Sequence, residues 1–288
     1  MSYRVDIDIE NIKSLLNINE SELAKSLNIP RSTLYRWKTN ENIISKNYLE
    51  LFYNYIYEQG IYLNNLKSQL FNEYCKENEK LLFHGAKGLI NGALSSKVGR
   101  DNNDFGQGFY AGENLFQSAS FISSYENSSL YMFKYKHNSN LKITEFYVDQ
   151  EWMLAIAFYR KKLDNYANHP IILRIREKVE SSDIVIAPIA DNQMYQIIDD
   201  FIFGNLTDEQ TKHALSATNL GKQYVFLNDN SLNNLELLEH CYLCDKEKKD
   251  YLEQKNKENI TGIQKVKIAK REFAGKGKYI EEIFDEKI

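Results

Sequence analysis

The sequence has few of the features that mark secreted or membrane proteins. Only three cysteines and three prolines occur among 288 residues, and three cysteines cannot all pair with one another, which argues against a disulfide scaffold. No stretch approaches the roughly 18 uncharged apolar residues of a membrane span. The first residues, MSYRVDIDIENIKSLL, carry acids and lack a cationic start followed by an apolar run. We therefore expect no secretory signal, no membrane partner and a cytoplasmic location.

An excess of positive charge is absent as well. The formal net charge is -4, which excludes a globally basic nucleic-acid binder and leaves only local basic patches. Hydrophobic residues make up 43% and charged residues 26% of the chain, which is typical of a globular protein. At this length the chain is long enough for two domains.

A metal site is not expected from the cysteines. The spacing of His240, Cys241 and Cys244 could supply two or three zinc ligands, but no second pair follows to complete a tetrahedron. We expect these two cysteines and Cys75 to be small buried hydrophobic side chains, and no metal cofactor.

Apolar residues recur at helical spacing between residues 11 and 57. Asn19 is placed to cap a helix that begins near Glu20. Asn28 tolerates a left-handed turn, and Pro30 suits the start of the next helix. This pattern predicts a helix, a short turn and a second helix.

The segment ESELAKSLNIPRSTLYRWKTN resembles the helix-turn-helix of phage-repressor-like regulators. The resemblance implies DNA contacts from the start of the second helix, through Arg31, Ser32, Thr33, Tyr35 and Arg36. Residues 1–57 carry seven basic and seven acidic side chains, so any DNA affinity should be modest and could require a dimer. The alternatives are a helical bundle used for packing or dimerisation, or a surface that binds a protein such as an antitoxin.

Four regions follow from the composition. We expect a helix-turn-helix domain over 1–60, a linker helix over 61–79, a larger domain over 80–240 and a charged, Lys-rich extension over 241–288. A helix from about residue 43 to 77, broken near Gly60, would form the connection.

The region after the linker mixes short strands and helices. Strands are predicted over 80–83, 131–136, 142–147, 183–187 and 223–227. Helices are predicted over 152–163 and 194–203, and a further one is expected to begin at Thr207, which is followed by acids. Because no regular alternation of strand and helix is visible, this region is predicted to be an α+β domain.

The extension is strongly basic in its second half. Between Gln264 and Lys278 six basic residues face one acid. We expect a solvated strand or loop there, with a phosphate-backbone contact to a nucleic acid as the alternative.

Three separated pieces carry the chemistry: LFHGAK at 82–87, DFGQGFYAGE at 104–113 and GKQYVFLN at 221–228. Breaking the bond between nicotinamide and ribose in NAD builds positive charge on the sugar. The reaction needs a clamp for the carboxamide, a flat surface for the ring and a polar acceptor near the ribose 2'-hydroxyl.

Each of the three pieces can supply one of these three features of an NAD-binding site. In the first, His84 can reach a ribose hydroxyl, and Gly85 lets backbone groups approach the carboxamide closely. In the second, a tight turn would present Tyr110 as a ring platform. In the third, Gln223 would stand at the end of a strand and face the cleft.

Together the pieces resemble the His, Tyr and Glu motifs of the poly(ADP-ribose) polymerase and diphtheria-toxin branch of ADP-ribosyltransferases. The likeness extends to a bacterial branch, domain of unknown function 3990, whose members share the DFGxGFY run, a PIAD-like segment (here 188–191) and a closing QYVF. It covers about 80–240 and implies a split β-sheet with peripheral helices, with NAD as the substrate.

The resemblance also implies roles for single residues. His84 matches the ribose-binding histidine, Gly85 the carboxamide clamp and Tyr110 the stacking tyrosine, with Gly108 and Phe109 beside it in the NAD pocket. Gln223 occupies the position of the catalytic glutamate. An amide can accept a hydrogen bond but carries no negative charge, so we expect transfer of a single ADP-ribose or no transfer at all.

Polar residues near the motifs are further candidates. Ser95 and Arg100 could hold the NAD pyrophosphate, and Arg100 is preferred to Lys97 because a guanidinium binds phosphate bidentately; a plain surface loop is the alternative. Asp191 and Asn192 could orient Gln223 or the acceptor, or could simply cap the helix that follows.

The motifs predict a mono-ADP-ribosyltransferase, and the resemblance implies that it is a toxin of a toxin–antitoxin or phage-defence system. Its partners would be NAD, a macromolecular acceptor (protein, DNA or RNA), an antitoxin protein and DNA. The loop over 217–222 would select the acceptor. The alternative is an inactive NAD or ADP-ribose sensor that controls DNA binding by the first domain.

Overall fold

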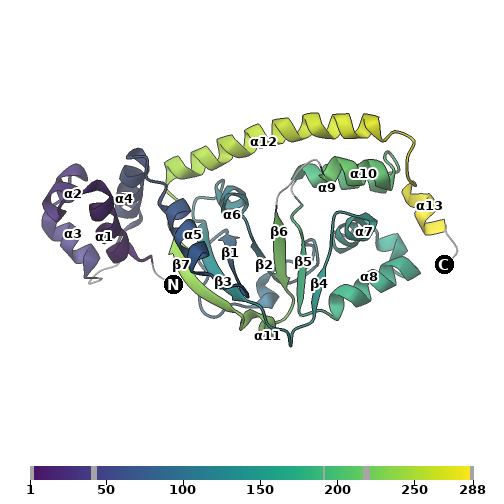
Figure 1. Ribbon diagram of the computed structural model, residues 1–288, viewed down its shortest axis with the longest axis horizontal. Helices are drawn as coiled ribbons and strands as arrows, with labels where there is room; N and C mark the ends of the chain where they lie inside the picture. The colour runs from purple at the N-terminus through teal and green to yellow at the C-terminus, as the bar shows by residue number, and fades with distance from the viewer. Residues whose placement is uncertain (1–2, 40–43, 191, 217–220, 286–288) are drawn as a thin grey trace.

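A helical unit lies beside a larger mixed domain in the computed structural model, which describes residues 3–39, 44–190, 192–216 and 221–285 (Figure 1). The helical unit consists of α1 (Val5–Leu16), α2 (Glu20–Ser26), α3 (Arg31–Lys38) and α4 (Lys46–Glu58). Its core includes fully buried apolar side chains from all four helices, among them Ile9, Leu23, Leu34 and Phe52.

Local sequence signals set the boundaries of α2 and α3. The side chain of Asn19 accepts a hydrogen bond from the backbone N–H of Glu22 at 3.0 Å, and the Glu22 carboxylate accepts from the N–H of Asn19 at 2.8 Å, which forms a capping box. Asn28 adopts a left-handed conformation with φ of 52°, and Pro30 is the N-cap of α3. The predicted helix, short turn and second helix are confirmed.

One sheet of seven strands forms the centre of the larger domain, in the order β4-β5-β6-β2-β1-β3-β7. The strands are β1 (Glu79–Ala86), β2 (Phe109–Gly112), β3 (Ser129–Lys136), β4 (Ile143–Glu145), β5 (Ile184–Pro188), β6 (Lys222–Phe226) and β7 (Leu235–Cys241). Only β4 and β5 pair in parallel; the other neighbours are antiparallel. The five predicted strands are present, whereas β2 and β7 were not predicted.

The sheet is divided into two halves. β1 and β3 pair in register over eight residues of each strand, but β1 and β2 share the single register pair Phe83↔Gly112. The halves β4-β5-β6-β2 and β1-β3-β7 are therefore joined at one point and separate beyond it.

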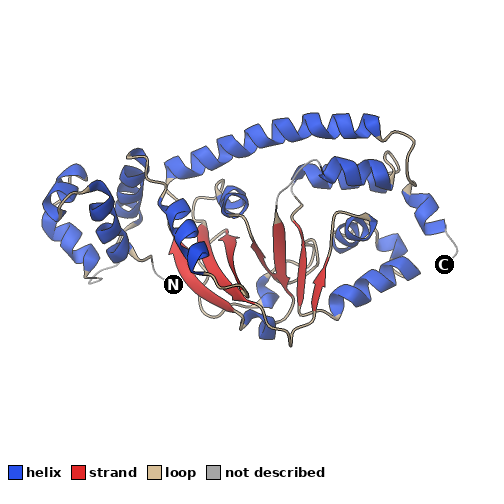
Figure 2. Cartoon of the chain, in the orientation of Figure 1, coloured by secondary structure: helices blue, strands red, loops and turns tan. Residues whose placement is uncertain are grey.

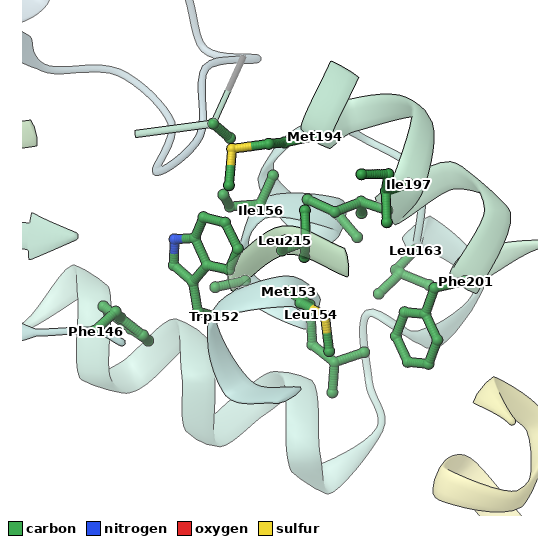
Figure 3. Packing of buried hydrophobic residues seen from close by; sticks show 14 of the residues in the cluster. Phe146, Trp152, Met153, Leu154, Ile156, Leu163, Met194, Ile197, Phe201 and Leu215 are labelled. Carbon is green, nitrogen blue, oxygen red and sulfur yellow. The ribbon is translucent and has the colours of Figure 1, made fainter. Parts of the chain in front are cut away.

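Helices cover the sheet on both sides of this junction. They are α5 (Leu63–Tyr74), α6 (Leu115–Ile122), α7 (Gln150–Tyr159), α8 (Pro170–Glu180), α9 (Asn192–Ile202), α10 (Asp208–Ser216) and α11 (Asp229–Leu232), with 3-10 turns η1 (Ser96–Val98) and η2 (Asp164–Tyr166). Every residue from Trp152 to Ala157 is at most 1% exposed, as expected for the uniformly apolar run WMLAIA. Figure 3 shows Trp152 and its neighbours from α7, α9 and α10 packed together.

The basic C-terminal region is helical. α12 (Asp245–Glu272) runs along one side of the molecule from α4 to α10, and α13 (Ile280–Asp285) follows it (Figures 1 and 2). We expected a solvated strand or loop from residue 264. This was wrong for residues 264–272, which belong to α12. The apolar residues Val266 and Ala269, three apart, are buried, and the nearby Lys265 and Lys267 are exposed.

A buried ion cluster attaches the helical unit to the larger domain. Nζ of Lys67 lies 2.6 Å from Asp8 of α1 and 2.9 Å from Glu239 of β7. The Tyr53 hydroxyl donates to the other oxygen of Asp8 at 2.7 Å, and its ring stacks on Tyr242 with centroids 5.0 Å apart. Since buried charges are tolerated only when paired, these contacts fix how α1 and α4 sit against β7.

Candidate active site

His84 lies at the opening between the two halves of the sheet. Its Nδ1 is 2.6 Å from the carbonyl oxygen of Tyr110 on β2, and its ring stacks on Phe109 with centroids 4.4 Å apart. A carbonyl only accepts, so Nδ1 carries the proton and Nε2 of the neutral ring is left as an acceptor. Burial lowers the pKa of this imidazole, although the bond to the Tyr110 carbonyl acts in the opposite direction.

Gln223 is held next to the same junction. The register pairs Phe83↔Gly112 and Gly112↔Gln223 place one residue of β1, β2 and β6 in a single row across the sheet. At two strand spacings, about 10 Å separates the β1 and β6 backbones in this row. The topology thus places Gln223 in the same row as Phe83, the residue that precedes His84.

The amide of Gln223 has a defined orientation. Nε2 donates to Oδ2 of Asp104 at 2.9 Å and to the carbonyl of Pro188 at 3.1 Å. Both neighbours are acceptors, so the NH2 group must face them. The amide oxygen therefore points away from these partners, where a ribose hydroxyl could donate to it.

Tyr110 is fixed by the turn that precedes β2. Its hydroxyl donates to the carbonyl of Gly106 at 2.8 Å and accepts from the N–H of Phe105 at 3.1 Å. Burial and the nearby charge of Asp104 raise the pKa of this phenol. The expected tight turn at Tyr110 was wrong: the turn lies at Gly106, with φ of 77°, and residue 110 already pairs with Val225 in the sheet.

The side chains of His84 and Gln223 approach this opening from opposite faces of the sheet. Side chains alternate along a strand, and Tyr110 and Gln223 share the face of Val225, whereas His84 shares the face of Phe109. His84 and Gln223 therefore flank, from opposite faces, the point where β1 and β2 cease to pair.

A family model described as a protein of unknown function, DUF3990, matches residues 80–237, which is more than half of the chain. The chain belongs to the DUF3990 family. Neither a curated protein nor a solved structure matches it.

Two glycines predicted to line the NAD pocket, Gly85 and Gly108, pack closely against protein atoms. A Cβ on Gly85 would lie 2.5 Å from the carbonyl oxygen of Ser118 and 2.8 Å from the Ile122 side chain, both on α6. We expected Gly85 to make room for a ligand, but the structure gives this space to α6. A Cβ on Gly108 would lie 3.0 Å from the carbonyl of Phe226, so this glycine allows β2 to pass close to β6.

The proposed phosphate-binding residues lie on a loop held against the DFGQGFY run. Gln107 donates to the carbonyls of Lys97 and Gly99 at 2.8 and 3.1 Å. Ser95 donates to Asp229 at 3.3 Å, so its hydroxyl is engaged within the protein. Arg100 is exposed, which leaves its guanidinium available for a phosphate.

Asp104 and Arg160 also belong to the site, although no sequence motif assigned them a role. Asp104 is 5% exposed and accepts from the Nε of Arg160 at 2.9 Å and from the Tyr195 hydroxyl at 2.8 Å, in addition to Gln223. The only sequence signal was the position of Asp104 at the start of the DFGQGFY run. Ser118, also missed, donates to the Phe83 carbonyl at 3.1 Å, beside the junction.

Two further expectations fall partly outside the described residues. Asp191 and residues 217–220 of the acceptor loop are not described, and neither is the side chain of Asn192. Lys222 at the end of this loop is described, and its ammonium group pairs with Glu145.

The α3 residues predicted to contact DNA differ in exposure. Four are exposed on one side of the helix: Arg31, Ser32, Tyr35 and Arg36. Thr33 is only 7% exposed, and its hydroxyl accepts from Nη2 of Arg36 at 3.3 Å. The expectation for Thr33 needs correction, because this side chain supports Arg36 from within the fold and is not presented to a ligand.

No group of three or more His, Cys, Asp and Glu side chains suited to a metal occurs within the described ranges. Cys241 and Cys244 are each 1% exposed and pack in apolar clusters, which confirms their expected role as buried hydrophobic residues.

A groove of about 580 Å³ lies elsewhere, between α1 and α5, and contains none of the candidate residues. Across the described helices, none has both the length and the apolar character needed to span a bilayer.

Proposed function

We propose that the DUF3990 domain of this chain is an NAD-dependent mono-ADP-ribosyltransferase that acts in the cytoplasm on a macromolecular acceptor, a protein or a nucleic acid. The proposal rests mainly on one observation. His84 on β1 and Gln223 on β6 come from the two halves of the sheet and flank the single register pair that joins them, from opposite faces.

The arrangement suits cleavage of the glycosidic bond of NAD. The bond between C1' of the ribose and the nicotinamide nitrogen breaks, and its electron pair leaves with nicotinamide. A nucleophile of the acceptor then forms a bond to C1' and loses its proton. Hydrogen bonds from ribose hydroxyls to His84 and Gln223 would hold the sugar while it becomes electron-poor.

The remaining residues support the same reaction. Tyr110, whose hydroxyl is tied to the Phe105–Gly106 turn, would form one wall for the nicotinamide ring. Arg100 would pair with the pyrophosphate. Because the position of the family's glutamate is held by Gln223, we expect one ADP-ribose per acceptor site and no chain growth.

The test is nicotinamide release from NAD by the purified full-length chain, with and without cell extract, together with labelling of macromolecules from NAD marked in its adenylate group. We expect release and labelling by the wild type and loss of both by more than about 100-fold in Gln223→Ala. Gln254→Ala, at an exposed position on α12, is the matched control and should behave as the wild type. A wild type as inert as Gln223→Ala would refute the proposal.

The resemblance to ADP-ribosyltransferases also motivates a biological role as a toxin of a toxin–antitoxin or phage-defence system. Induced expression should then arrest growth, and His84→Ala should relieve the arrest. Mass spectrometry of proteins and nucleic acids after brief induction, compared with His84→Ala, would identify the acceptor.

The exposed face of α3 favours a second function, a regulator that binds DNA and senses NAD or ADP-ribose. Arg31 and Arg36 stand on the side of α3 that a groove-reading helix presents to DNA. Removal of both by substitution with Ala should weaken DNA binding and lower its salt dependence, since each contributes about one phosphate contact. Arg174→Ala, exposed on α8, is the control. A gel shift that responds to NAD, without any NAD consumption, would favour the sensor. A stable complex with an antitoxin, in the absence of DNA affinity, would instead indicate that the helical unit binds a protein partner.

A further inference from the structure

A buried carboxylate lies directly behind the amide of Gln223. Asp104 accepts three hydrogen bonds from side chains: one at Oδ2 from Gln223 at 2.9 Å, and two at Oδ1 from Arg160 at 2.9 Å and Tyr195 at 2.8 Å. All three partners donate, which matches an ionised carboxylate. A negative charge is therefore held one hydrogen bond away from the residue that stands in the place of a catalytic glutamate.

The negative charge of Asp104 is only partly balanced by neighbouring positive charge. Arg160 is the cation paired with Asp104, and it lies flat on the ring of Tyr195 with Cζ 3.4 Å from the ring centroid. Its side chain is 32% exposed, so solvent screens the guanidinium more than the carboxylate. Gln223, by contrast, bonds to the other oxygen of Asp104 on the buried side.

A carboxylate that accepts from an amide NH2 group changes the amide itself. Electron density moves from nitrogen toward the amide oxygen, which becomes a stronger acceptor. The oxygen of Gln223 can then stabilise positive charge on a nearby ribose better than the oxygen of an isolated amide.

We propose that Asp104 is a positioning residue that supplies, through Gln223, the negative charge that a glutamate would carry at this site. The inference rests on the proposed function and deepens it. Asp104 does not touch the substrate; it fixes the direction of the Gln223 amide and polarises its oxygen toward the ribose hydroxyl. No proton moves between the two side chains during the reaction.

The test moves the negative charge from residue 104 to residue 223. In Asp104→Asn the charge is lost, and we expect kcat for nicotinamide release to fall about 10- to 100-fold with little change in KM. In the double variant Asp104→Asn with Gln223→Glu, the carboxylate stands at position 223 and the amide behind it. We expect kcat to return to within about threefold of the wild type.

The outcomes separate a role in charge from a role in folding. If Asp104 only holds the loop in place, the second substitution cannot repair the first, and a double variant as slow as Asp104→Asn would overturn the inference. An Asp104→Asn variant with full kcat would overturn it as well. A wild type that releases no nicotinamide would instead remove the proposed function itself, so the two failures are distinguishable.

A second variant covers the case in which Asp104→Asn does not fold. In Gln223→Glu alone, two carboxylates lie in contact, and their mutual repulsion favours a shared proton. We expect kcat to acquire an ionisation above pH 5 that the wild type lacks. A profile identical to that of the wild type would show that residue 104 carries no charge that position 223 can sense.

Discussion

Nδ1 of His84 donates to the backbone carbonyl of Tyr110 at 2.6 Å, across the gap where β1 and β2 cease to pair. The side chain replaces the backbone ladder at this point and closes one end of the opening. Because the bond requires a proton on Nδ1, it also decides that Nε2 is the acceptor offered to a ligand.

The first prediction concerns the protonation of His84. Burial lowers its pKa, so the folded state binds fewer protons than the unfolded state once the pH falls below the ordinary value of about 6.5. The contribution of this residue to stability is present above pH 6.5 and is lost as the pH falls toward the lowered pKa. We expect the free energy of unfolding to decrease between pH 6.5 and 5 more steeply in the wild type than in His84→Asn.

Nitrogen NMR provides the direct measurement. The Nε2 resonance should have the shift of an unprotonated imidazole nitrogen at pH 6.5, and Nδ1 that of a protonated one. An imidazolium at this pH would contradict the assignment.

The second prediction concerns Gly85. In Gly85→Ala the new Cβ meets the backbone carbonyl of Ser118 at 2.5 Å, and a backbone atom of a packed helix cannot move aside cheaply. We expect a destabilisation of about 1–3 kcal/mol and a lower melting temperature. Gly88→Ala is the matched control, since nothing lies within 4 Å of its Cβ. Equal melting temperatures for the two variants would disprove the packing role.

The third prediction concerns Glu247, which is buried at the start of α12 and accepts from Asn64 at 3.1 Å. Burial raises its pKa to about 7. The folded state then holds a proton that the unfolded state has already released, so stability falls as the pH rises from about 4.5 to about 7 and stays lower above it. A shift of this size corresponds to roughly 3 kcal/mol.

Glu247→Gln removes the titration and keeps an oxygen for Asn64. We expect the variant to be more stable than the wild type at pH 8 and to lose the pH dependence in this window, as measured by urea unfolding. Glu253→Gln, exposed on the same helix, should leave the pH dependence unchanged. A variant that loses stability at pH 8 would show that the carboxylate is favourable where it lies.

The fourth prediction concerns Lys67, the cation between Asp8 and Glu239. In Lys67→Met the buried carboxylates of Asp8 and Glu239 lose the cation that lies between them, and we expect a loss of about 3–5 kcal/mol. Because the cluster joins α1 to β7, proteolysis should separate the helical unit first. Lys25→Met, exposed on α2, is the control, and equal stability of the two variants would argue against the cluster as the anchor.

The local part of the fold could be predicted from the sequence because its causes are local. Asn19 caps α2 through the backbone two to three residues away, and Asn28 turns the chain without help from elsewhere. The long helix α12 could not be predicted from its charge. Its buried residues Val266 and Ala269 are few, and burial by elements distant in sequence decides their conformation.

The site shows the same division. His84, Tyr110 and Gln223 could be selected because their motifs resemble those of ADP-ribosyltransferases, whereas only the structure shows that His84 lies on the opposite face of the sheet from Tyr110 and Gln223. Asp104 could not be given a role, because its partners Arg160 and Gln223 lie 56 and 119 residues away.

The order of residues by itself determined the helix caps, most strands and the chemical types available at the site, since these follow from neighbours along the chain. Only the tertiary structure decided that Gly85 faces α6, that Thr33 is buried beneath Arg36, and that a carboxylate stands behind Gln223. Those relationships depend on which distant segments pack together, and the burial that holds them there has no signature in any single stretch of sequence.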